Sequence, residues 1–272
     1  MDKFVVIGNP IKHSKSPRIH QLFSQHTGKQ LNYATCLAEP ERFEETLADF
    51  FMRGGLGANI TMPFKEQAFR YCHSLTPRAE LAGAVNTVKP LSEGHLLGDN
   101  TDGIGLVSDL QRLLMLKAHC RILLIGAGGA ARGIILPLLE LGHHITITNR
   151  TYTKAQMLAD VFTPHGCIYA KPLHEIVTPE YELIINATSA GVNDTVPELD
   201  SCVLTPQVKC YDLFYQKGDT AFVHWAKIHG CHACADGLGM LVAQAAHAFY
   251  LWHGVMPEIE PVLNQLRQEL EA

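Results

Sequence analysis

The sequence predicts an α/β protein with two domains, each built on a sheet that helices cover. Short β-rich runs alternate with amphipathic stretches along the chain, which is the pattern of βαβ units. A continuous apolar run at residues 121–125 is typical of a strand buried on both faces of a parallel sheet. With 272 residues, 47% of them hydrophobic, the chain can bury two separate cores.

The first domain should contain a mixed sheet, because a β-hairpin closes a series of parallel strands. Its first helix is expected where Ser16-Pro17 gives a capping residue and a proline at the first helical position, with Gly28 just beyond the end. The hairpin is expected to turn at Ser92-Glu93-Gly94. The expected elements are strands 4–8, 31–37 and 56–61, helices 16–28, 40–53 and 63–71, and hairpin strands 84–89 and 95–98.

The second domain begins its sheet at 121–125, and the glycine-rich turn that follows opens a helix running to residue 141. The last two helices have no strand left to pair and are expected to pack back onto the first domain. We therefore assign residues 1–101, completed by helices within 238–272, to one domain and residues 102–237 to the other. The further elements are strands 144–148, 167–170, 183–186 and 208–213, and helices 238–252 and 258–270.

Charge and composition exclude several classes of function. A net charge of -5 argues against nucleic acid, whose binding relies on clustered Lys and Arg. The first apolar run is too short for a signal peptide or a membrane span, so we expect a cytoplasmic protein with no membrane partner. The one close cysteine pair, in Cys231-His232-Ala233-Cys234, lacks the second pair that structural zinc needs, so no metal site is expected. The oligomeric state stays open, with a homodimer as one alternative.

A dinucleotide site is indicated by the turn after strand 121–125. This turn has the spacing G-x-G-x-x-A, at Gly126, Gly128 and Ala131. Gly126 would permit the tight turn, Gly128 the approach of the backbone to a pyrophosphate, and Ala131 close packing of the helix on the strand. The amides at the helix N-terminus would face the negative charge. We therefore expect the second domain to be Rossmann-like.

The end of the next strand predicts NADP rather than NAD. NAD-binding domains place an acidic residue there for the ribose hydroxyl, and this chain has Asn149 instead. A carboxylate would repel a 2'-phosphate, whereas Arg150, Thr151 and Lys154 supply hydrogen-bond donors and positive charge. Taken singly, Arg150 is better explained as a solvated charge at a strand end and Thr151 as a helix cap, so the prediction depends on the residues acting together.

Motifs along the whole chain resemble those of the shikimate dehydrogenases. Chance does not place so many unrelated segments in the right order, so the resemblance is specific. Besides the Gly126 turn, the motifs are Gly8-Asn9-Pro10-Ile11-x-His13-Ser14-x-Ser16-Pro17, Gly57-Ala58-Asn59-Ile60-Thr61-x-Pro63-Phe64-Lys65, Ala82-Gly83-Ala84-Val85-Asn86-Thr87, Gly98-Asp99-Asn100-Thr101-Asp102-Gly103, Asn149-Arg150-Thr151, Asn186-Ala187-Thr188-Ser189, Tyr211-Asp212-x-Phe214-Tyr215 and Ala235-Asp236-Gly237-Leu238-Gly239-Met240-Leu241-x-x-Gln244.

The resemblance implies an NADP-dependent oxidoreductase that reversibly reduces 3-dehydroshikimate to shikimate, a step of aromatic amino acid biosynthesis. Reducing a ketone requires a hydride on carbon and a proton on the developing alkoxide, so the site needs an acid whose charge stabilises that oxygen. In the family, the lysine that matches Lys65 is the acid/base group, and the aspartate that matches Asp102 lies beside the same hydroxyl. Which of the two holds the proton stays open.

The remaining site residues also follow from the resemblance. Lys154 stands where many NADP-specific relatives have Arg, which keeps the charge but loses the planar fork. Leu213 replaces a frequent Met of similar volume. The substrate carboxylate is expected at Ser14, Ser16 and Tyr215, and the ring hydroxyls at Asn59, Thr61, Lys65, Asn86, Asp102 and Gln244. The cofactor is expected at Gly126, Ala127, Gly128, Gly129 and Ala130 (phosphates), Asn149, Arg150, Thr151 and Lys154 (2'-phosphate), and Thr188, Leu213, Gly237 and Met240 (ribose and nicotinamide).

Most of these residues also have an ordinary structural interpretation. Taken alone, Lys65 is a solvated lysine in a first helical turn, Asp102 a helix cap and Ser16 the N-cap of the helix at Pro17. Gln244 is harder to explain in this way, since an unpartnered amide is unfavourable in a largely apolar helix. Two alternative functions stay open: a quinate/shikimate dehydrogenase that also uses NAD, and a non-catalytic sensor that binds NADP or shikimate.

Overall fold

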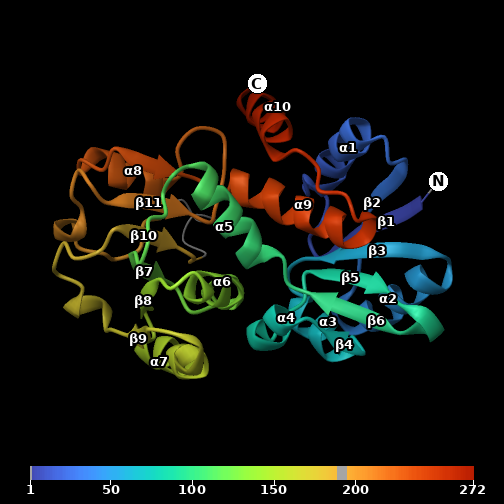
Figure 1. Cartoon of the computed structure of the whole chain (residues 1–272), viewed down its shortest axis with the longest axis horizontal. Helices are drawn as coiled ribbons and strands as arrows, with labels where there is room; N and C mark the ends of the chain where they lie inside the picture. The colour runs from blue at the N-terminus through green and yellow to red at the C-terminus, as the bar shows by residue number, and fades with distance from the viewer. Residues whose placement is uncertain (1, 189–194) are drawn as a thin grey trace. The chain divides into compact units, whose positions relative to one another are not determined.

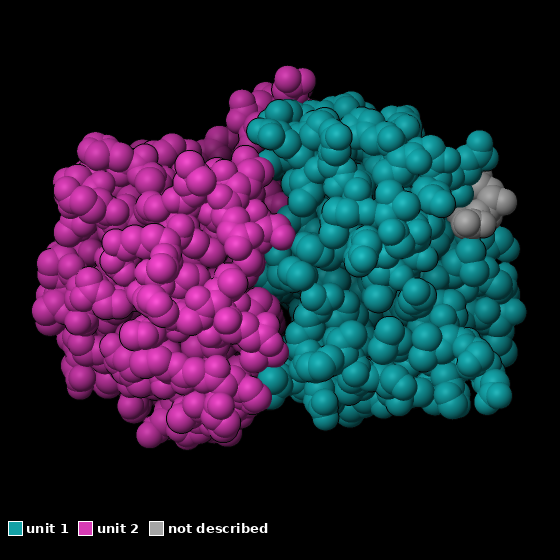
Figure 2. All heavy atoms as spheres, viewed as in Figure 1, with its two compact units in different colours: residues 1–105, 242–266 teal, residues 106–241, 267–272 magenta. Residues whose placement is uncertain are grey.

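The computed structural model describes residues 2–188 and 195–272, and the chain divides into two compact units, which Figure 2 shows in different colours. Unit 1 comprises Met1–Gly105 and Val242–Leu266, and unit 2 comprises Leu106–Leu241 and Arg267–Ala272. Ser189, part of one motif quoted above, lies outside the described residues. Within the described ranges, no helix is both long and apolar enough to cross a membrane.

Unit 1 contains a six-stranded mixed sheet (Figure 1), formed by β1 (Asp2–Gly8), β2 (Leu31–Leu37), β3 (Gly55–Ile60), β4 (Ser74–Leu75), β5 (Thr87–Pro90) and β6 (Leu96–Asp99). The strand order is β2-β1-β3-β5-β6-β4. Strand β1 pairs in parallel with β2 and β3, whereas β5 is antiparallel to both β3 and β6. The expected mixed sheet, closed by a hairpin, is confirmed.

The helices of unit 1 are α1 (Ser16–Thr27), α2 (Phe43–Met52), α3 (Lys65–Tyr71), α4 (Pro77–Ala82) and most of α9 (Leu238–His253) and α10 (Ile259–Glu271). Helix α1 ends at Thr27 and is followed by Gly28 as its C-cap, whose φ of 70° is left-handed, as the glycine predicted. Helix α9 packs on the sheet, where Trp252 Nε1 donates to the Val88 carbonyl at 3.1 Å. A side chain at Gly57 would collide with the Trp252 indole, so this glycine permits the close packing of α9.

Unit 2 contains a six-stranded parallel sheet, formed by β7 (Arg121–Ile125), β8 (His144–Thr148), β9 (Ile168–Ala170), β10 (Leu183–Asn186), β11 (Lys209–Asp212) and β12 (Ala233–Ala235). The order is β9-β8-β7-β10-β11-β12, which is the order of the dinucleotide-binding sheet. The Rossmann-like expectation is confirmed. Ligands of such sheets bind at the carboxyl ends of the strands where the order reverses, here between β7 and β10.

Helices α6 (Gly129–Glu140), α7 (Tyr152–Phe162) and α8 (Ala221–Ile228) belong to unit 2, and α5 (Asp102–Arg112) begins in unit 1 and continues in unit 2. Several short elements have no counterpart in the sequence analysis. Strands β4 and β12 and helix α4 contain too few residues for a period to be recognised. Helix α5 could have been predicted, because the buried Leu106 and Leu110 are separated by one helical turn.

Candidate functional site

The two predicted catalytic side chains form an ion pair in unit 1. Lys65 begins α3 and Asp102 begins α5, and Lys65 Nζ lies 2.5 Å from Asp102 Oδ2. The side chain of Lys65 is 31% exposed and that of Asp102 is 11% exposed, so the lysine keeps part of its surface open to a ligand. An ammonium held in this way can donate a hydrogen bond, or a proton, to a ligand oxygen. The pairing therefore permits the chemistry expected of these residues.

Asn86 fixes the orientation of the Asp102 carboxylate. Its Nδ2 donates to Asp102 Oδ1 at 2.8 Å and to Thr101 Oγ1 at 2.9 Å. The same amide lies 3.3 Å from Gln244 Oε1, and the Thr101 amide donates to Asn86 Oδ1 at 2.9 Å. Asn86 and Thr101 are buried, and an unpaired buried polar group costs on the order of 1–3 kcal/mol, so each side chain is strongly held in place. Both oxygens of Asp102 are thus bound from known directions.

Gln244 reaches this network because α5 and α9 approach each other closely within unit 1. A side chain at Gly105 of α5 would lie 2.7 Å from the Cβ of Gln244 on α9. Thr101 Oγ1 lies 3.4 Å from Gln244 Oε1, so the amide is not isolated in its largely apolar helix. The structure thereby joins the last predicted substrate residue of the chain to the Asn86 network.

A second group of polar side chains is linked to the first through Asn59. Its Nδ2 donates to the Asn86 carbonyl at 3.2 Å and to Thr87 Oγ1 at 3.0 Å, and Tyr33 donates its hydroxyl to Asn59 Oδ1 at 2.7 Å. Burial raises the pKa of Tyr33 well above its usual value, although a hydrogen bond with Ser16 acts in the opposite direction. Tyr33 therefore stays neutral and can keep donating.

Ser16 is not the N-cap that its place before Pro17 suggested. Helix α1 begins at Ser16 itself, and the N-cap position is held by Lys15 without a side-chain hydrogen bond. Instead, the Ser16 amide donates to Ser14 Oγ at 3.3 Å, and the Ser16 hydroxyl pairs with Tyr33. The two serines predicted to bind a carboxylate therefore lie together at the start of α1.

Three members of the network were not singled out from the sequence. Thr87 and Thr101 lie inside the family motifs, next to Asn86 and Asp102 in the sequence, so they could have been predicted as members of the network. Tyr33 had none, because its partner is 26 residues away on another strand. Thr61, which was predicted, follows β3, and its methyl group packs against Gly8 so closely that a side chain at Gly8 would collide with it.

A buried ion pair anchors the turn that precedes Asp102. Asp99 accepts from Arg78 Nε at 2.7 Å and Nη2 at 2.5 Å, and from Thr76 Oγ1 at 2.6 Å. Burial opposes ionisation of Asp99, but the hydrogen bonds and charge of Arg78, helped by Thr76 and the Asn100 amide, outweigh it and lower the pKa. Asp99 is therefore an anion that fixes the backbone on which Asp102 is mounted.

The glycine-rich turn of unit 2 lies at the switch point of the sheet. Gly126 has a φ of +111°, and a side chain there would lie 2.9 Å from the Ala187 carbonyl after β10, so only glycine fits. Helix α6 starts with Gly128 as its N-cap, and no side chain caps its first amides. Among the residues that the structure describes, a Cβ on Gly128 or Gly129 would meet nothing within 4 Å. First-turn amides without a side-chain cap fit a dinucleotide pyrophosphate, and Ala127 and Ala130 lie on the same turn.

The predicted 2'-phosphate residues follow β8. Asn149 Nδ2 donates to the Thr151 carbonyl at 2.9 Å, which shapes the turn. Thr151 is the N-cap residue of α7, as its structural interpretation predicted, but its hydroxyl makes no cap hydrogen bond. Arg150, Thr151 and Lys154 are all exposed. Two cations and a free hydroxyl at the N-terminus of a helix form a suitable environment for a phosphate.

A buried polar chain orders the loops after β10 and β11. Thr188 donates through its hydroxyl at 2.8 Å and its amide at 3.2 Å to Asn186 Oδ1. Asn186 Nδ2 in turn donates to Asp212 Oδ1 at 3.0 Å, and Asp212 also accepts from the Phe214 amide and from Thr220 Oγ1. Thr188, predicted to contact the cofactor, is therefore held by groups that are themselves completely buried.

The other residues expected near the nicotinamide lie just after β11, just after β12 and at the start of α9. A side chain on Gly237 would collide with the carbonyl oxygen of Leu213, so the two segments touch through their backbones. The amide of Met240 donates to the Tyr211 hydroxyl at 3.3 Å. Tyr215 follows β11, and burial, with a smaller effect from the charge of Asp236, raises its pKa. Tyr215 belongs to unit 2, and its contact with the substrate stays a prediction.

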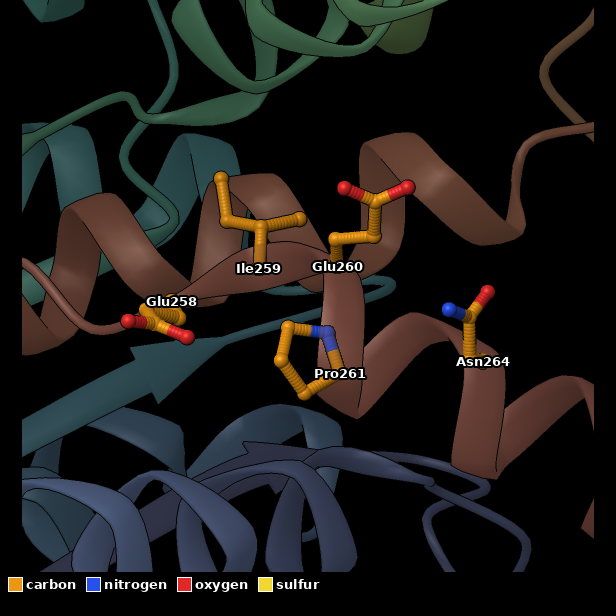
Figure 3. Close-up of a pocket in the computed structure, with 5 residues that line it drawn as sticks. All are labelled: Glu258, Ile259, Glu260, Pro261 and Asn264. Atoms are coloured by element: carbon orange, nitrogen blue, oxygen red, sulfur yellow. The ribbon is translucent and has the colours of Figure 1, made fainter.

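A hollow at the start of α10 is separate from these residues. It has a volume of about 580 Å³ and contains none of the predicted site residues, and Figure 3 shows the carboxylates of Glu258 and Glu260 beside it. Two carboxylates would repel an acidic substrate. We therefore assign the hollow no part in the site. Its lining residues are Glu258, Ile259, Glu260, Pro261 and Asn264.

Three models of known protein families match successive parts of the chain. Residues 6–88 match the shikimate dehydrogenase substrate binding domain. Residues 110–194 match shikimate / quinate 5-dehydrogenase, and residues 237–267 match the shikimate 5'-dehydrogenase C-terminal domain. The matches fall on both units.

Solved structures resemble the chain over nearly its whole length. An Ael1 enzyme from Pseudomonas putida is 40% identical, with 98% of each chain covered and a TM-score of 0.93. Shikimate 5-dehydrogenase from Thermus thermophilus, solved with NADP(H) and shikimate, is 32% identical, with 99% of this chain and 100% of that chain covered and a TM-score of 0.90. A 5-ketofructose reductase from a Gluconobacter species is 27% identical, with 98% of each chain covered and a TM-score of 0.89.

Proposed function

The chain belongs to the shikimate dehydrogenase family, and we propose that it catalyses the reversible NADPH-dependent reduction of 3-dehydroshikimate to shikimate. The observation that supports this most directly is the Lys65–Asp102 pair within a network of amides and hydroxyls. A small acid with several hydroxyls needs many short polar partners, because each unpaired buried group would cost on the order of 1–3 kcal/mol. The network of unit 1 supplies such partners beside a proton donor.

Lys65 is the proposed acid. Bound NADPH supplies a hydride to the carbonyl carbon of the substrate. As negative charge develops on the ketone oxygen, the Lys65 ammonium donates a proton to that oxygen and stabilises it. In the reverse direction the neutral amine takes the proton from the substrate hydroxyl.

Asp102 is the proposed orienting partner of Lys65. Its Oδ2 holds the lysine, while its Oδ1 is held by Asn86, so the carboxylate is restrained from rotating away. The same carboxylate can accept a hydrogen bond from a ring hydroxyl of the substrate. This double role would place the hydroxyl, the ammonium and the carboxylate in one fixed arrangement.

The other predicted residues are proposed to hold the two ligands. The cytoplasmic location stays a prediction, and the homodimer stays one open alternative for the oligomeric state. We propose that the substrate carboxylate is bound by Ser14, Ser16 and Tyr215, and the ring hydroxyls by Asn59, Thr61, Asn86 and Gln244. We propose that the cofactor is NADP, with its phosphates on the turn of residues 126–130, its 2'-phosphate at Asn149, Arg150, Thr151 and Lys154, and its nicotinamide half near Thr188, Leu213, Gly237 and Met240.

A second candidate is a reductase or dehydrogenase for a related polyhydroxylated compound. One family model covers quinate as well as shikimate enzymes, and a similar structure is that of a 5-ketofructose reductase. Polar networks accept an extra hydroxyl if a partner is free, so fold alone does not choose among these substrates.

The specificity constant kcat/KM decides between these candidates. It should be measured for shikimate and quinate with NADP and with NAD, and for 3-dehydroshikimate and 5-ketofructose with NADPH. We expect shikimate with NADP to exceed quinate with NADP, and NADP to exceed NAD, each by at least about tenfold, because unpaired buried groups and the missing 2'-phosphate reduce transition-state binding. Near-equal values for quinate would favour the broader dehydrogenase, and faster turnover of 5-ketofructose than of 3-dehydroshikimate would contradict the proposal.

A further inference from the structure

Three thiols of unit 2 lie together and take no part in the proposed reaction. Cys210 on β11 and Cys234 on β12 are direct neighbours in the parallel ladder. Cys231, on the loop before β12, has its Sγ 3.4 Å from the Sγ of Cys234, and Cys210 hydrogen-bonds with both. We call these three residues the thiol cluster. None of them forms a disulfide in the structure.

Position and chemistry distinguish two members of the thiol cluster. Cys231 is 2% exposed, whereas Cys234 is only partly buried, so a small oxidant can approach the pair from the side of Cys234. Hydrogen bonds from Cys210 and then Cys234 lower the pKa of Cys231, which favours its thiolate. The pKa of Cys234, in contrast, is raised to about 12, so Cys231 is the more nucleophilic sulfur and Cys234, 3.4 Å away, is the thiol that can capture it once it is oxidised.

Metal binding is a less suitable use of these sulfurs. Among the residues that the structure describes, no group of three or more His, Cys, Asp or Glu side chains could hold a metal ion. Two sulfurs 3.4 Å apart need to approach by little more than 1 Å to reach the length of a disulfide, which is about 2 Å. Oxidation therefore requires only a small movement of the two side chains.

We propose that Cys231 and Cys234 form a reversible disulfide when a hydroperoxide oxidises them, and that this disulfide weakens binding of the nicotinamide cofactor. The Cys231 thiolate attacks the peroxide, the O–O bond breaks, one oxygen passes to the Cys231 sulfur, which becomes a sulfenic acid, and the other leaves as water (or an alcohol) after taking up a proton. The Cys234 sulfur then attacks the Cys231 sulfur, the S–O bond breaks, and the oxygen leaves as a second water with the proton of the Cys234 thiol. Two thiols are oxidised by two electrons and one peroxide is reduced.

The link to the cofactor depends on the short distance between Cys234 and the end of β12. This strand ends at Ala235, and Gly237 follows it in backbone contact with Leu213 at the end of β11. Because there is no space for even a Cβ at this contact, a shift of β12 relative to β11 would displace one of the two segments. Both Leu213 and Gly237 are proposed cofactor residues, so their displacement would reduce affinity.

The test begins with the reduced full-length chain treated with hydrogen peroxide, followed by alkylation of the remaining thiols and mass spectrometry. We expect two fewer alkylated thiols and a peptide containing Cys231 and Cys234 that is lighter by two hydrogen atoms, with both changes reversed by dithiothreitol. The dissociation constant for NADPH should rise by at least about threefold on oxidation and return on reduction.

Variants separate this pair from the other cysteines. Cys234→Ser should abolish both the mass change and the change in NADPH affinity, while Cys202→Ser, which alters an exposed thiol of the same unit, should leave both intact. Cys234→Ala serves as a second variant if the serine variant unfolds. A chain that keeps all its thiols reduced, a disulfide that involves Cys210 instead, or an unchanged NADPH affinity after oxidation would each overturn the proposal.

Discussion

Lys65 is the residue on which the proposed chemistry depends most directly. Its motif made Lys65 predictable as the acid, and another motif made Asp102 predictable as its neighbour. The way in which Asn86 and Thr101 hold the Asp102 carboxylate was not predictable. Tyr33 was not predictable at all, since a single tyrosine on a strand has no sequence pattern that identifies its partner. At the scale of single residues, motifs identify the groups that touch a ligand better than those that hold them.

Replacing Lys65 with Met should slow turnover by roughly 10²–10⁴-fold, because the proton donor is lost while the apolar stem keeps its packing. The dissociation constant for NADPH should be nearly unchanged, since the predicted cofactor residues are elsewhere in the sequence. Steady-state kinetics and a binding titration measure the two effects. Lys29→Met, at an exposed lysine, is the matched control. If the Lys65→Met variant kept its activity, Lys65 would not be the acid.

His20 makes stability dependent on pH. Its ring is completely buried and stacks on Tyr33 with centroids 4.2 Å apart, and burial, followed by the charge of His253, lowers its pKa to about 3. The unfolded chain binds a proton at this residue below about pH 6.5 and the folded chain does not until near pH 3. The stability that depends on neutral His20 is therefore complete above about pH 6.5 and is lost as the pH falls towards 3.

The contribution of His20 can be measured by chemical denaturation at two pH values. Between pH 7 and pH 5 this residue alone should reduce the free energy of unfolding by about 2 kcal/mol. His20→Phe keeps an aromatic ring against Tyr33 and should lose correspondingly less stability over the same range. Equal pH dependence of the His20 variant and the parent would assign the effect to other groups.

At the scale of elements, the central strands and the last two helices were predicted, whereas helices α5, α7 and α8 and the shortest strands were not assigned from the sequence. Strands β7, β8 and β10 have the expected bounds, because continuous buried runs end at clear turn residues. Strands β4 and β12, with two and three residues, are defined by pairing with partners far along the chain, which no local pattern reports. The glycine-rich turn is the element whose function was clearest, because its spacing has a geometric cause.

Two glycines of that turn should respond differently to a methyl group. Gly128→Ala should leave the thermal stability of the free protein nearly unchanged, because its Cβ would enter open space, yet raise KM for NADP by about tenfold by obstructing the pyrophosphate. Gly126→Ala should also lower the free energy of unfolding, by about 1–3 kcal/mol, because of its positive φ and the nearby Ala187 carbonyl.

Thermal unfolding without ligand and steady-state kinetics distinguish the two glycine variants. Gly94→Ala provides a control for a positive φ in a turn of the other unit, with open space for the added methyl group. If Gly128→Ala had the KM of the parent, the pyrophosphate could not lie against this turn.

At the scale of the whole molecule, the fold class and the family were predictable and are confirmed. The division of the chain into units was harder to foresee, because α5 and α9 each pass from one unit into the other without interruption. Helical periodicity reports which face of a helix is buried and not which sheet buries it, so such a helix gives no sign of a boundary. Motif order, by contrast, was informative over the full length.

Whether the chain turns over its substrate is tested most directly by the absorbance of reduced nicotinamide after purified protein is mixed with shikimate and NADP. The account predicts a steady rise in absorbance, in proportion to enzyme concentration, that continues over many turnovers and nearly disappears in the Lys65→Met variant. Binding of both ligands without any rise in absorbance would contradict it, since the chain would then be a sensor and not a dehydrogenase.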